Sequence, residues 1–597
     1  MQIEKYSVNH HPIQTLLTWI ELGEIAIPEI QRPFVWDASK VRDLIDSLYE
    51  GFPIGYLIAW RNPNVKLKDG SSSKGKRVLI DGQQRITAIM AAILEKHIVN
   101  KDYKRIKIII AFHPKEKKFE VSNPAIENDK NWISNIATVL SPKCKPHKFV
   151  SDYCKENQIT EEDEIDEIAD NVEILRGIIN NHIGLIELNS DLGIEIVSEI
   201  FIRINSQGAV LSQADFAMSK IAANENYEGD KIRKCIDYFC HLAVEPDFFE
   251  KLIDFDKEFT LTEFFQKMSW LKNENDDLYN PSYTDMLRVA FASEFERGRL
   301  QDLVALLSGR NFETRDYEEE IAKESFTKLK KGLLTFMNET HFKRFLMILQ
   351  SAGFIESSMI RSQNAINFAY IAYLIMKREQ YEPSIIEHNV RRWFVMSLLT
   401  GRYSASPESA FDFDIKRISA IGFSKYLQEV EESDLSESFW RVGLPQQMIT
   451  SVASSPYFKV FLASQVHSLD KGFLSKDITI ADLIKYRGDI HHIFPKNYLK
   501  EQGLNRGQYN QISNYVMMQS EINIAIGYSS PTVYFTKLIN EPGSFGAITD
   551  MDEIQDNFRM HCLPPEMESK TVIDYDEFLS ERRKLMSEKI KNYYGKL

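Results

Sequence analysis

Hydrophobic and polar positions follow three different patterns along the chain, and together they predict an α+β protein with several domains. Up to about residue 225, short apolar runs typical of strands alternate with segments that have a helical apolar face. From about 226 to 440 nearly every segment has helical periodicity, and beyond 441 the two patterns mix again. We therefore predict domains at residues 1–225, 226–440 and 441–597, the second being a helical bundle or spacer.

The first region has the pattern of an α/β domain. Strands are expected at residues 25–27, 54–60, 77–80 and 182–188, and residues 106–112 are expected to form a hairpin with 118–121. A helix is expected over residues 37–49, where every third or fourth residue is apolar and either Asp37 or Ser39 is a suitable cap. Further helices are expected over 87–94 and 194–204.

Composition narrows the class of protein. The chain has 597 residues, of which 43% are hydrophobic and 26% charged, as in ordinary globular proteins. It has no apolar run of the roughly 18 residues that a membrane span needs, and no signal-like start. Five scattered cysteines without CxxC spacing indicate free thiols. We expect a cytoplasmic protein without a membrane partner.

The net charge of −14 bears on nucleic-acid binding. It argues against a surface that is basic throughout, but a local basic groove is enough to bind a phosphate backbone.

A candidate catalytic segment lies near the C-terminal end. The turn Gly488-Asp489 precedes the run Ile490-His491-His492-Ile493-Phe494-Pro495. A second expected strand, 515–518, directly follows Asn514, and Ser520 is a suitable cap for a helix that carries Asn523.

Two strands and a helix can gather these side chains around one small space. Phosphodiester hydrolysis needs a deprotonated water, for which a neutral histidine is suited, and a divalent metal that polarises the phosphate and stabilises the leaving oxygen. The alternative is an ordinary strand with a histidine pair.

This segment resembles the HNH (ββα-metal) nucleases. Their pattern has an acidic residue or histidine, then His, two apolar residues and Pro, followed by an Asn at the second strand and a His or Asn in the helix. The resemblance implies that His492 is the general base, that His491 and Asn523 are metal ligands, and that Asn514 braces the loop carrying His492. Many members have Asp at the position of His491. Because imidazole suits transition metals better than Mg²⁺, the choice among Mg²⁺, Mn²⁺ and another transition metal stays open.

A second constellation lies in residues 27–36 and 79–87. In the latter, a strand is expected to end at Asp81-Gly82, a turn dipeptide, and Gln83-Gln84-Arg85 begins a helix. Free N–H groups at a helix start favour a phosphate, and a guanidinium adds a fork of donors. Glycine allows a ligand to approach the backbone, and the carboxylate suits a metal or a sugar hydroxyl. Local chemistry supports a plain turn and helix start equally well, and the chain has no Walker loop here.

These segments resemble the ParB/sulfiredoxin-like domain of GmrS-type restriction proteins, whose hallmark is the Asp-Gly-Gln-Gln-Arg run. Residues 201–208, which continue to Leu211 and Asp215, are similar to a third stretch of that family. The resemblance implies binding and hydrolysis of a nucleoside triphosphate. It assigns the nucleotide site to Asp81, Gly82, Gln83, Gln84 and Arg85, with Gln31 and Arg32 as weaker candidates.

Other residues have two interpretations. Arg203 and Asn205 are nucleotide ligands or a helix end that closes into a loop. The aromatic side chains of Phe34 and Trp36 either belong to the hydrophobic core or stack on nucleic-acid bases, and we favour the core. Two short stretches, 391–393 and 401–403, combine arginine with an aromatic residue and are suited to contact a DNA backbone or to lie along a bundle helix.

Both ends of the chain resemble fused GmrSD, SspE and BrxU-like proteins, which are bacterial anti-phage restriction enzymes. The resemblance implies a nucleotide-regulated, metal-dependent DNA endonuclease or nickase that acts on double-stranded DNA, modified phage DNA above all. Two alternatives are a nucleotide-gated DNA-binding sensor and an NTPase with an inactive HNH unit. A homodimer is one option for the oligomeric state.

Overall fold

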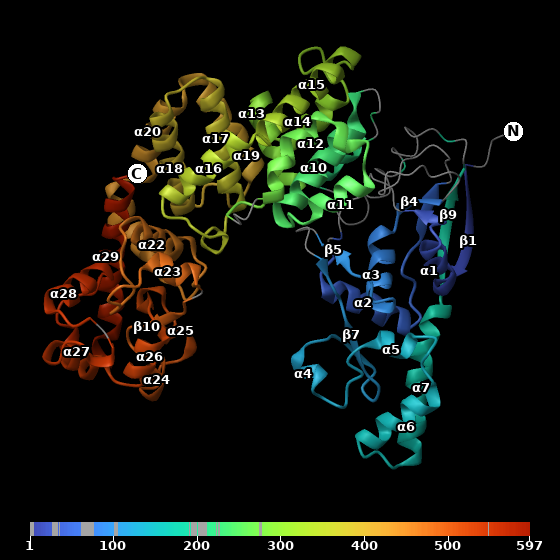
Figure 1. The fold of residues 1–597 in the computed structure, drawn as a ribbon, viewed down its shortest axis with the longest axis horizontal. Coiled ribbons are helices and arrows are strands. Elements are labelled where there is room, and N and C mark those ends of the chain that lie inside the picture. The colour runs from blue at the N-terminus through green and yellow to red at the C-terminus, as the bar shows by residue number, and fades with distance from the viewer. Residues whose placement is uncertain are drawn as a thin grey trace. The chain divides into compact units, whose positions relative to one another are not determined.

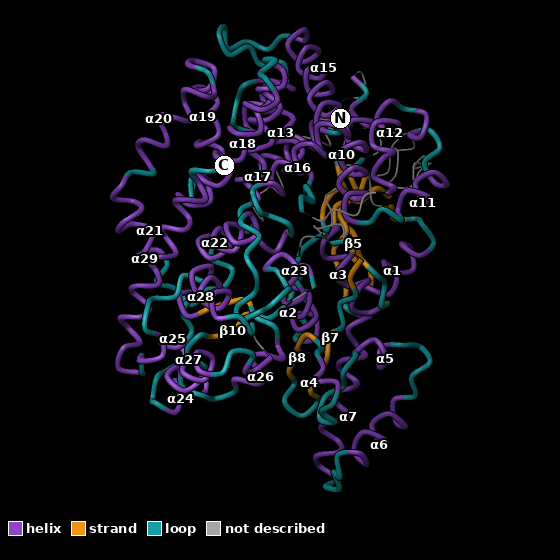
Figure 2. Tube along the Cα trace, turned by 60° about the vertical axis from the view of Figure 1, so that its left-hand side comes forward, coloured by secondary structure: helices purple, strands orange, loops and turns teal. Residues whose placement is uncertain are grey.

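The computed structural model describes residues 5–26, 34, 36–60, 77–100, 105–189, 192, 200, 212–222, 224, 227–273, 278–486, 488–546 and 548–597. The chain forms two compact units: an N-terminal unit of residues 1–273 and 304–323, and a C-terminal unit of residues 274–303 and 324–597. Helices predominate and the sheets are small (Figure 2), so the predicted α+β class is confirmed. The division into three domains stays a prediction.

A five-stranded mixed sheet supports the N-terminal unit (Figure 1). Its strand order is β1-β9-β3-β4-β2, with β9 antiparallel to β1 and parallel to β3, and β4 antiparallel to β3 and parallel to β2. The strands are β1 (Tyr6–Pro12), β2 (Ile25–Ala26), β3 (Leu57–Trp60), β4 (Arg77–Asp81) and β9 (His182–Leu188). The strand expected from residue 54 begins at Leu57, because Gly55 has a φ of +88° and interrupts the extended backbone.

Three short strand pairs accompany this sheet in the part of the chain that the structure describes. In the N-terminal unit, β5 (Ile98–Val99) pairs with β6 (Arg105–Ile106), and β7 (Ile110–His113) pairs with β8 (Lys118–Val121). The expected hairpin therefore exists, but its first strand is shorter than predicted. The remaining pair, in the C-terminal unit, carries the histidines described below.

The N-terminal unit also contains a set of helices. Asp37 caps α2 by accepting a hydrogen bond from the backbone N–H of Lys40 at 2.9 Å, so Asp37, not Ser39, is the cap. Phe34 is buried in the core and Trp36 packs against it, which confirms the core interpretation of both. The helices are α1 (Ile13–Glu21), α2 (Ala38–Tyr49), α3 (Gln83–Ile93), α4 (Pro124–Glu127), α5 (Ile136–Leu140), α6 (Pro146–Glu156), α7 (Glu162–Gly177), α9 (Gln213–Ala222), α10 (Gly229–Val244), α11 (Phe248–Phe255) and α12 (Glu263–Met268). The helix expected over 194–204 falls almost entirely outside the described residues.

The C-terminal unit is mostly helical. Its helices are α13 (Tyr283–Phe295), α16 (Glu339–Ser351), α17 (Gln363–Arg378), α18 (Pro383–Thr400), α19 (Pro407–Ile421), α20 (Phe423–Asp434), α21 (Leu444–Gln447), α22 (Pro456–His467), α23 (Ile480–Lys485), α24 (Lys496–Glu501), α25 (Arg506–Tyr509), α26 (Ser520–Ile526), α27 (Pro531–Asn540), α28 (Met551–Met560) and α29 (Tyr575–Tyr594). Two more helices, α14 (Leu300–Leu307) and α15 (Glu319–Phe336), span points where the chain passes between the units.

Two arginines that were candidates for DNA contact are engaged inside the C-terminal unit. Arg402 bonds to the buried carboxylate of Asp414 at 2.5 and 2.9 Å, and Arg392 pairs with Glu431 at 2.7 Å. The neighbouring aromatics, Trp393 and Tyr403, are buried. The DNA-contact interpretation of these four side chains is therefore wrong, because carboxylates and the core already hold them.

Among the described residues, no helix has both the length and the apolar character to cross a membrane.

Candidate functional site

The two histidines lie in a ββα arrangement in the C-terminal unit. Strand β10 (Ile490–His492) pairs antiparallel with β11 (Tyr515–Met517), which places His491 opposite Val516 and His492 opposite Tyr515. Helix α26 follows β11 closely, and its apolar face packs into the same core as the residues around both strands. Ser520 is the first residue of α26 and the N-cap is Gln519, without a side-chain bond, so the predicted Ser520 cap is wrong.

Asn514 fixes the backbone that follows His492. Its side chain is fully buried; Oδ1 accepts a hydrogen bond from the Phe494 N–H at 2.8 Å, and Nδ2 donates to the Phe494 carbonyl at 3.1 Å. The backbone adds a bond from the Ile493 N–H to the Asn514 carbonyl at 2.9 Å. The segment after the histidine pair is thus held from the second strand, which is the contact that a bracing asparagine would make.

The imidazole of His492 has a defined orientation. Its Nε2 lies 3.0 Å from Oδ1 of Asn510, and its ring packs edge-on against that of Tyr515. An amide Oδ1 accepts, so the proton of the neutral ring stands on Nε2 and the lone pair on Nδ1. Burial lowers the pKa of His492 and the nearby charge of Lys496 lowers it further, although the Asn510 bond opposes both. The ring is therefore neutral, and able to accept a proton, near pH 7.

Asn510 is the member of this arrangement that sequence reasoning missed. It lies in the polar segment between the two strands, outside the spacing of the HNH pattern. The only signal was its type: an amide, in a loop that must return to the first strand.

His491 has an unsatisfied nitrogen. Its Nε2 is buried and has no hydrogen-bond partner among the described residues. Burial lowers its pKa, and the carboxylate of Asp489 opposes that shift only in part, so the ring is neutral near pH 7. A buried neutral imidazole nitrogen without a partner is chemically suited to ligate a metal ion.

Asn523 lies in the middle of α26 and is partly exposed. The structure places it in the same ββα unit as His491 but gives no hydrogen bond between the two side chains. Within the described part of the chain, no three or more His, Cys, Asp or Glu side chains form a metal-binding group. The predicted ligand pair, one imidazole and one amide, is smaller than such a group and stays a prediction.

In the N-terminal unit, the guanidinium of Arg85 ties a loop to α3. Nη2 pairs with Oδ2 of Asp81 at 2.9 Å, while Nη1 donates to the carbonyls of Ile54 and Tyr56 at 3.1 and 2.8 Å. The fork of donors that was expected to face a phosphate is thus partly used by the protein itself. Gly55 allows this close approach, since a Cβ there would lie 2.6 Å from Nη1.

Both packing and backbone conformation favour glycine at position 82. Its φ is +92°, and a Cβ at this position would lie 2.3 Å from Cδ2 of Leu57 in β3. Helix α3 starts at Gln83, which is buried, and no side chain caps its N-terminus. Gln84 is partly buried. The hallmark residues therefore occupy one strand end and one helix start, as expected.

Residues 13–222 match the family model described as the GmrSD restriction endonuclease, N-terminal domain. This region is a GmrSD N-terminal domain. The family resemblance inferred from Asp81–Arg85 is thereby confirmed. Gln31, Arg32 and residues 201–208 fall inside the matched range but outside the described residues.

The whole chain also has a relative of similar length. It is 22% identical to the uncharacterized protein MJ0686 of Methanocaldococcus jannaschii, and the alignment covers 95% of this chain and 96% of that protein. The similarity therefore extends over almost the entire length of both proteins, beyond the range of the matched N-terminal domain.

A cavity of about 420 Å³ lies next to the hallmark residues of the GmrSD domain. One wall is the loop 51–56, whose carbonyls at Ile54 and Tyr56 are those held by Arg85. The other wall comes from His10, from Leu48 and from residues 180–182. Arg85 thus holds the backbone of a loop that lines this cavity.

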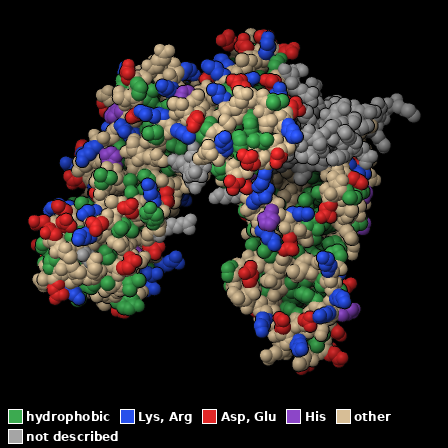
Figure 3. Space-filling model, in the orientation of Figure 1, with side chains coloured by type: hydrophobic (Ala, Val, Ile, Leu, Met, Phe, Trp, Pro, Cys, Tyr) green, Lys and Arg blue, Asp and Glu red, His purple; other side chains and the backbone are tan. Residues whose placement is uncertain are grey.

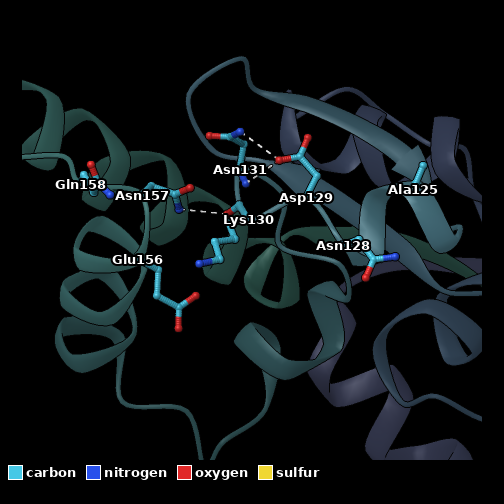
Figure 4. Close-up of a pocket in the computed structure, with 8 residues that line it drawn as sticks. All are labelled: Ala125, Asn128, Asp129, Lys130, Asn131, Glu156, Asn157 and Gln158. Atoms are coloured by element: carbon cyan, nitrogen blue, oxygen red, sulfur yellow. Dashed lines mark hydrogen bonds between the residues drawn. The ribbon is translucent and has the colours of Figure 1, made fainter.

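A larger hollow of about 560 Å³ lies between α4 and α6 of the same unit (Figure 4). Its polar groups already bond to one another: Asp129 accepts from Asn131, and Asn157 donates to the Lys130 carbonyl. On the face drawn in Figure 3, acidic and basic side chains are interspersed over both units, so the negative net charge is not gathered on that face.

Proposed function

We propose that the protein is a metal-dependent DNA endonuclease whose HNH-type site lies in the C-terminal unit. One observation carries the proposal: a neutral His492, oriented by Asn510, directly follows His491, whose buried Nε2 has no hydrogen-bond partner among the described residues, on a strand braced by Asn514. A purely structural histidine is expected to have its buried ring nitrogens hydrogen-bonded, whereas the Nε2 of His491 has no partner among the described residues. The GmrSD N-terminal domain supports the same reading, since its family consists of restriction endonucleases.

The chemistry assigned to the side chains follows from their states. His492 accepts a proton from the attacking water at Nδ1, because Nε2 is bonded to Asn510. His491 and Asn523 would hold a divalent ion, which supplies charge stabilisation at the phosphate and the leaving oxygen. Asn514 keeps the His492 backbone in place through its bonds to Phe494.

Two cations near the site suit a polyanionic substrate. The charge of Lys496 acts on the His492 imidazole, and that of Arg506 acts on the Tyr515 phenol, so both lie close to the imidazole and its ring neighbour. Both side chains are exposed. They provide a local basic surface on a chain whose net charge is −14, as a DNA backbone requires.

Plasmid cleavage tests this proposal. Supercoiled DNA is incubated with the full chain and Mg²⁺ or Mn²⁺, and the wild type is compared with His492→Ala. The control is His147→Ala, which removes an exposed histidine from α6 of the other unit. Loss of cutting in His492→Ala alone is expected; equal cutting by all three proteins would rule out the HNH assignment.

We further propose that a nucleoside triphosphate bound at Asp81–Arg85 regulates the cutting of modified DNA. The uncapped start of α3 offers backbone N–H groups to a phosphate, and Asp81 and Arg85 stand at its first turn. Arg85 also holds the loop 54–56, so a nucleotide that contacts Arg85 would change the position of that loop and the shape of the cavity that it lines.

This second proposal is tested by comparing the release of phosphate from nucleotide by Asp81→Asn and Arg85→Lys with that by the wild type. Both changes approximately keep the size of the side chain while weakening the ion pair, so a fall in hydrolysis per folded molecule is expected. Phage DNAs with different modifications, each incubated with and without each nucleotide, then show which modification is cut. Unchanged hydrolysis in both variants would contradict the nucleotide site.

A further inference from the structure

The most unusual buried group in the C-terminal unit is the guanidinium of Arg582 on α29. Its side chain is 0% exposed, and its hydrogen-bond partners in the described chain are backbone carbonyls, not carboxylates. Burial lowers its pKa to about 10, so the group stays charged near pH 7. A buried charge without a counterion is costly, and an apolar side chain of similar size would fill the same space more cheaply.

The bonds of Arg582 converge on the turn that contains Asn514. Nη1 donates to the carbonyl of Ser513 at 2.8 Å and to that of Tyr515 at 2.9 Å. Nε donates to the carbonyl of His561 at 3.1 Å, while Nη2 is buried without a partner. One nitrogen thus bridges the two carbonyls on either side of Asn514.

This bridge sets the direction in which the Asn514 side chain points. Rotation of the peptide group before Asn514, or of the one after Tyr515, would break a bond to the same Nη1. Asn514 in turn holds the backbone of Phe494, the second residue after His492. A chain of bonds therefore runs from Arg582 through Asn514 to the segment that carries the proposed base.

We propose that Arg582 is a positioning residue of the nuclease site, which acts on His492 through the Asn514 turn. The inference rests on the proposed function for its catalytic consequence, but the bond network can be tested without catalysis. The role requires the planar fork of arginine, since two carbonyls and a third from another segment must be reached at fixed angles.

The first measurement is structural. Hydrogen exchange of the Phe494 amide, which donates to Asn514, is followed in the full chain for wild type, Arg582→Met and Lys589→Met. Lys589 is a matched control: it lies on the same helix and its bonds go to Asp470 and the Met560 carbonyl, away from Asn514. Faster exchange at Phe494 in Arg582→Met, by about tenfold or more, is expected, with wild-type exchange in Lys589→Met. Equal exchange in all three proteins would overturn the proposal.

The second measurement is catalytic, normalised to the folded fraction of each protein. Arg582→Met is expected to lower kcat about tenfold or more without changing KM for DNA, because the base is displaced while the DNA surface is intact. Lys589→Met should keep wild-type kcat per folded molecule, even if it melts earlier. Equal losses of kcat in both variants would show a general destabilisation and overturn the positioning role.

Chemical rescue separates the guanidinium from the rest of the side chain. Arg582→Ala leaves a space lined by the three carbonyls, and millimolar guanidinium is expected to restore cleavage to that variant but not to His492→Ala. Absence of rescue together with wild-type exchange at Phe494 would refute the proposal. If the wild type itself cuts no DNA, the nuclease function fails, and the exchange experiment alone decides the role of Arg582.

Discussion

The Nε2 of His492 lies 3.0 Å from Oδ1 of Asn510, a residue that comes 18 positions later in the chain. This bond selects the tautomer of the imidazole and directs Nδ1 away from Asn510. It also has an electrostatic effect, because a neutral amide stabilises the protonated ring only weakly. The result is a histidine whose pKa stays below its usual value, as a base that works near neutral pH requires.

Replacing that amide by a carboxylate should shift the pH dependence of cleavage. Cleavage needs the neutral form of His492, so the rate rises with pH as the imidazole loses its proton. In Asn510→Asp a negative charge would stand next to the ring and raise its pKa, which moves the acidic limb of the kcat profile upward by about one pH unit or more. The ratio of kcat at pH 8 to kcat at pH 6 should increase about threefold to fivefold in a cleavage assay.

Asn505→Asp is the matched control for that shift. It makes the same Asn-to-Asp change on the same loop, at the residue that caps α25. Its pH profile should follow that of the wild type. Superimposable profiles for Asn510→Asp and the wild type would show that His492 is not the titrating base.

His561 makes the stability of the C-terminal unit depend on pH. Complete burial lowers its pKa to about 3, whereas the unfolded chain has the usual value of 6.5. Protons therefore bind the unfolded state first, and the stability present above pH 6.5 is lost as the pH falls from there towards 3. Between pH 6.5 and 5.0 this one group should remove about 2 kcal/mol from the free energy of unfolding.

Urea titrations at pH 7 and pH 5 measure this effect as the difference between the two free energies. In His561→Gln that difference should be smaller than in the wild type by about 2 kcal/mol. The exposed-residue variant His147→Gln should keep the wild-type difference, and a wild-type difference in His561→Gln would disprove the assignment.

Local patterns were enough to predict much of the fold and the candidate site. The alternation of apolar residues predicted β9 and the helix after Asp37, and the motif spacing placed both histidines on a strand that pairs with the segment after Asn514. These features depend on neighbouring residues, which the sequence displays directly.

Features that depend on distant residues were not predictable. Asn510 has no fixed spacing from His492, and Arg582 reaches Asn514 from a helix almost 70 residues away. Arg402 looked like a surface cation because its partner, Asp414, lies on the next helix and is buried there. A pattern of charges along the chain shows which side chains are ionised, but only the folded core shows which ones are paired.

Arg402 and Asp414 should stabilise the C-terminal unit only when both side chains are present. Asp414 is buried, bonds to Arg402 at 2.5 and 2.9 Å, and accepts hydrogen bonds from the hydroxyls of Tyr403 and Tyr426. Arg402→Met should cost about 3–5 kcal/mol of unfolding free energy, since it leaves a buried carboxylate unpaired.

A double-mutant cycle separates the pair from the packing around it. Adding Asp414→Asn to Arg402→Met removes the unpaired charge while both tyrosines keep an acceptor, so the double variant should be more stable than the sum of the single losses by about 1–3 kcal/mol. The exposed pair of Arg559 with Asp556 is the control, and Arg559→Met should change stability by about 0–1 kcal/mol. Strict additivity at Arg402 and Asp414 would contradict the coupling.

The metal preference of cleavage should depend on His491. Its buried Nε2 is a nitrogen donor, which favours Mn²⁺ and other transition metals over Mg²⁺, whereas a carboxylate oxygen suits Mg²⁺. His491→Asp is therefore expected to move the ratio of Mg²⁺-supported to Mn²⁺-supported cleavage towards Mg²⁺ by about tenfold. Both His491→Ala and Asn523→Ala should weaken Mn²⁺ binding, which calorimetry measures without any DNA.

Asp489→Asn tests the neighbouring carboxylate. Because Asp489 is a turn residue, this variant should leave Mn²⁺ binding unchanged. If Asp489→Asn weakens Mn²⁺ binding more than His491→Ala does, Asp489 replaces His491 as the ligand.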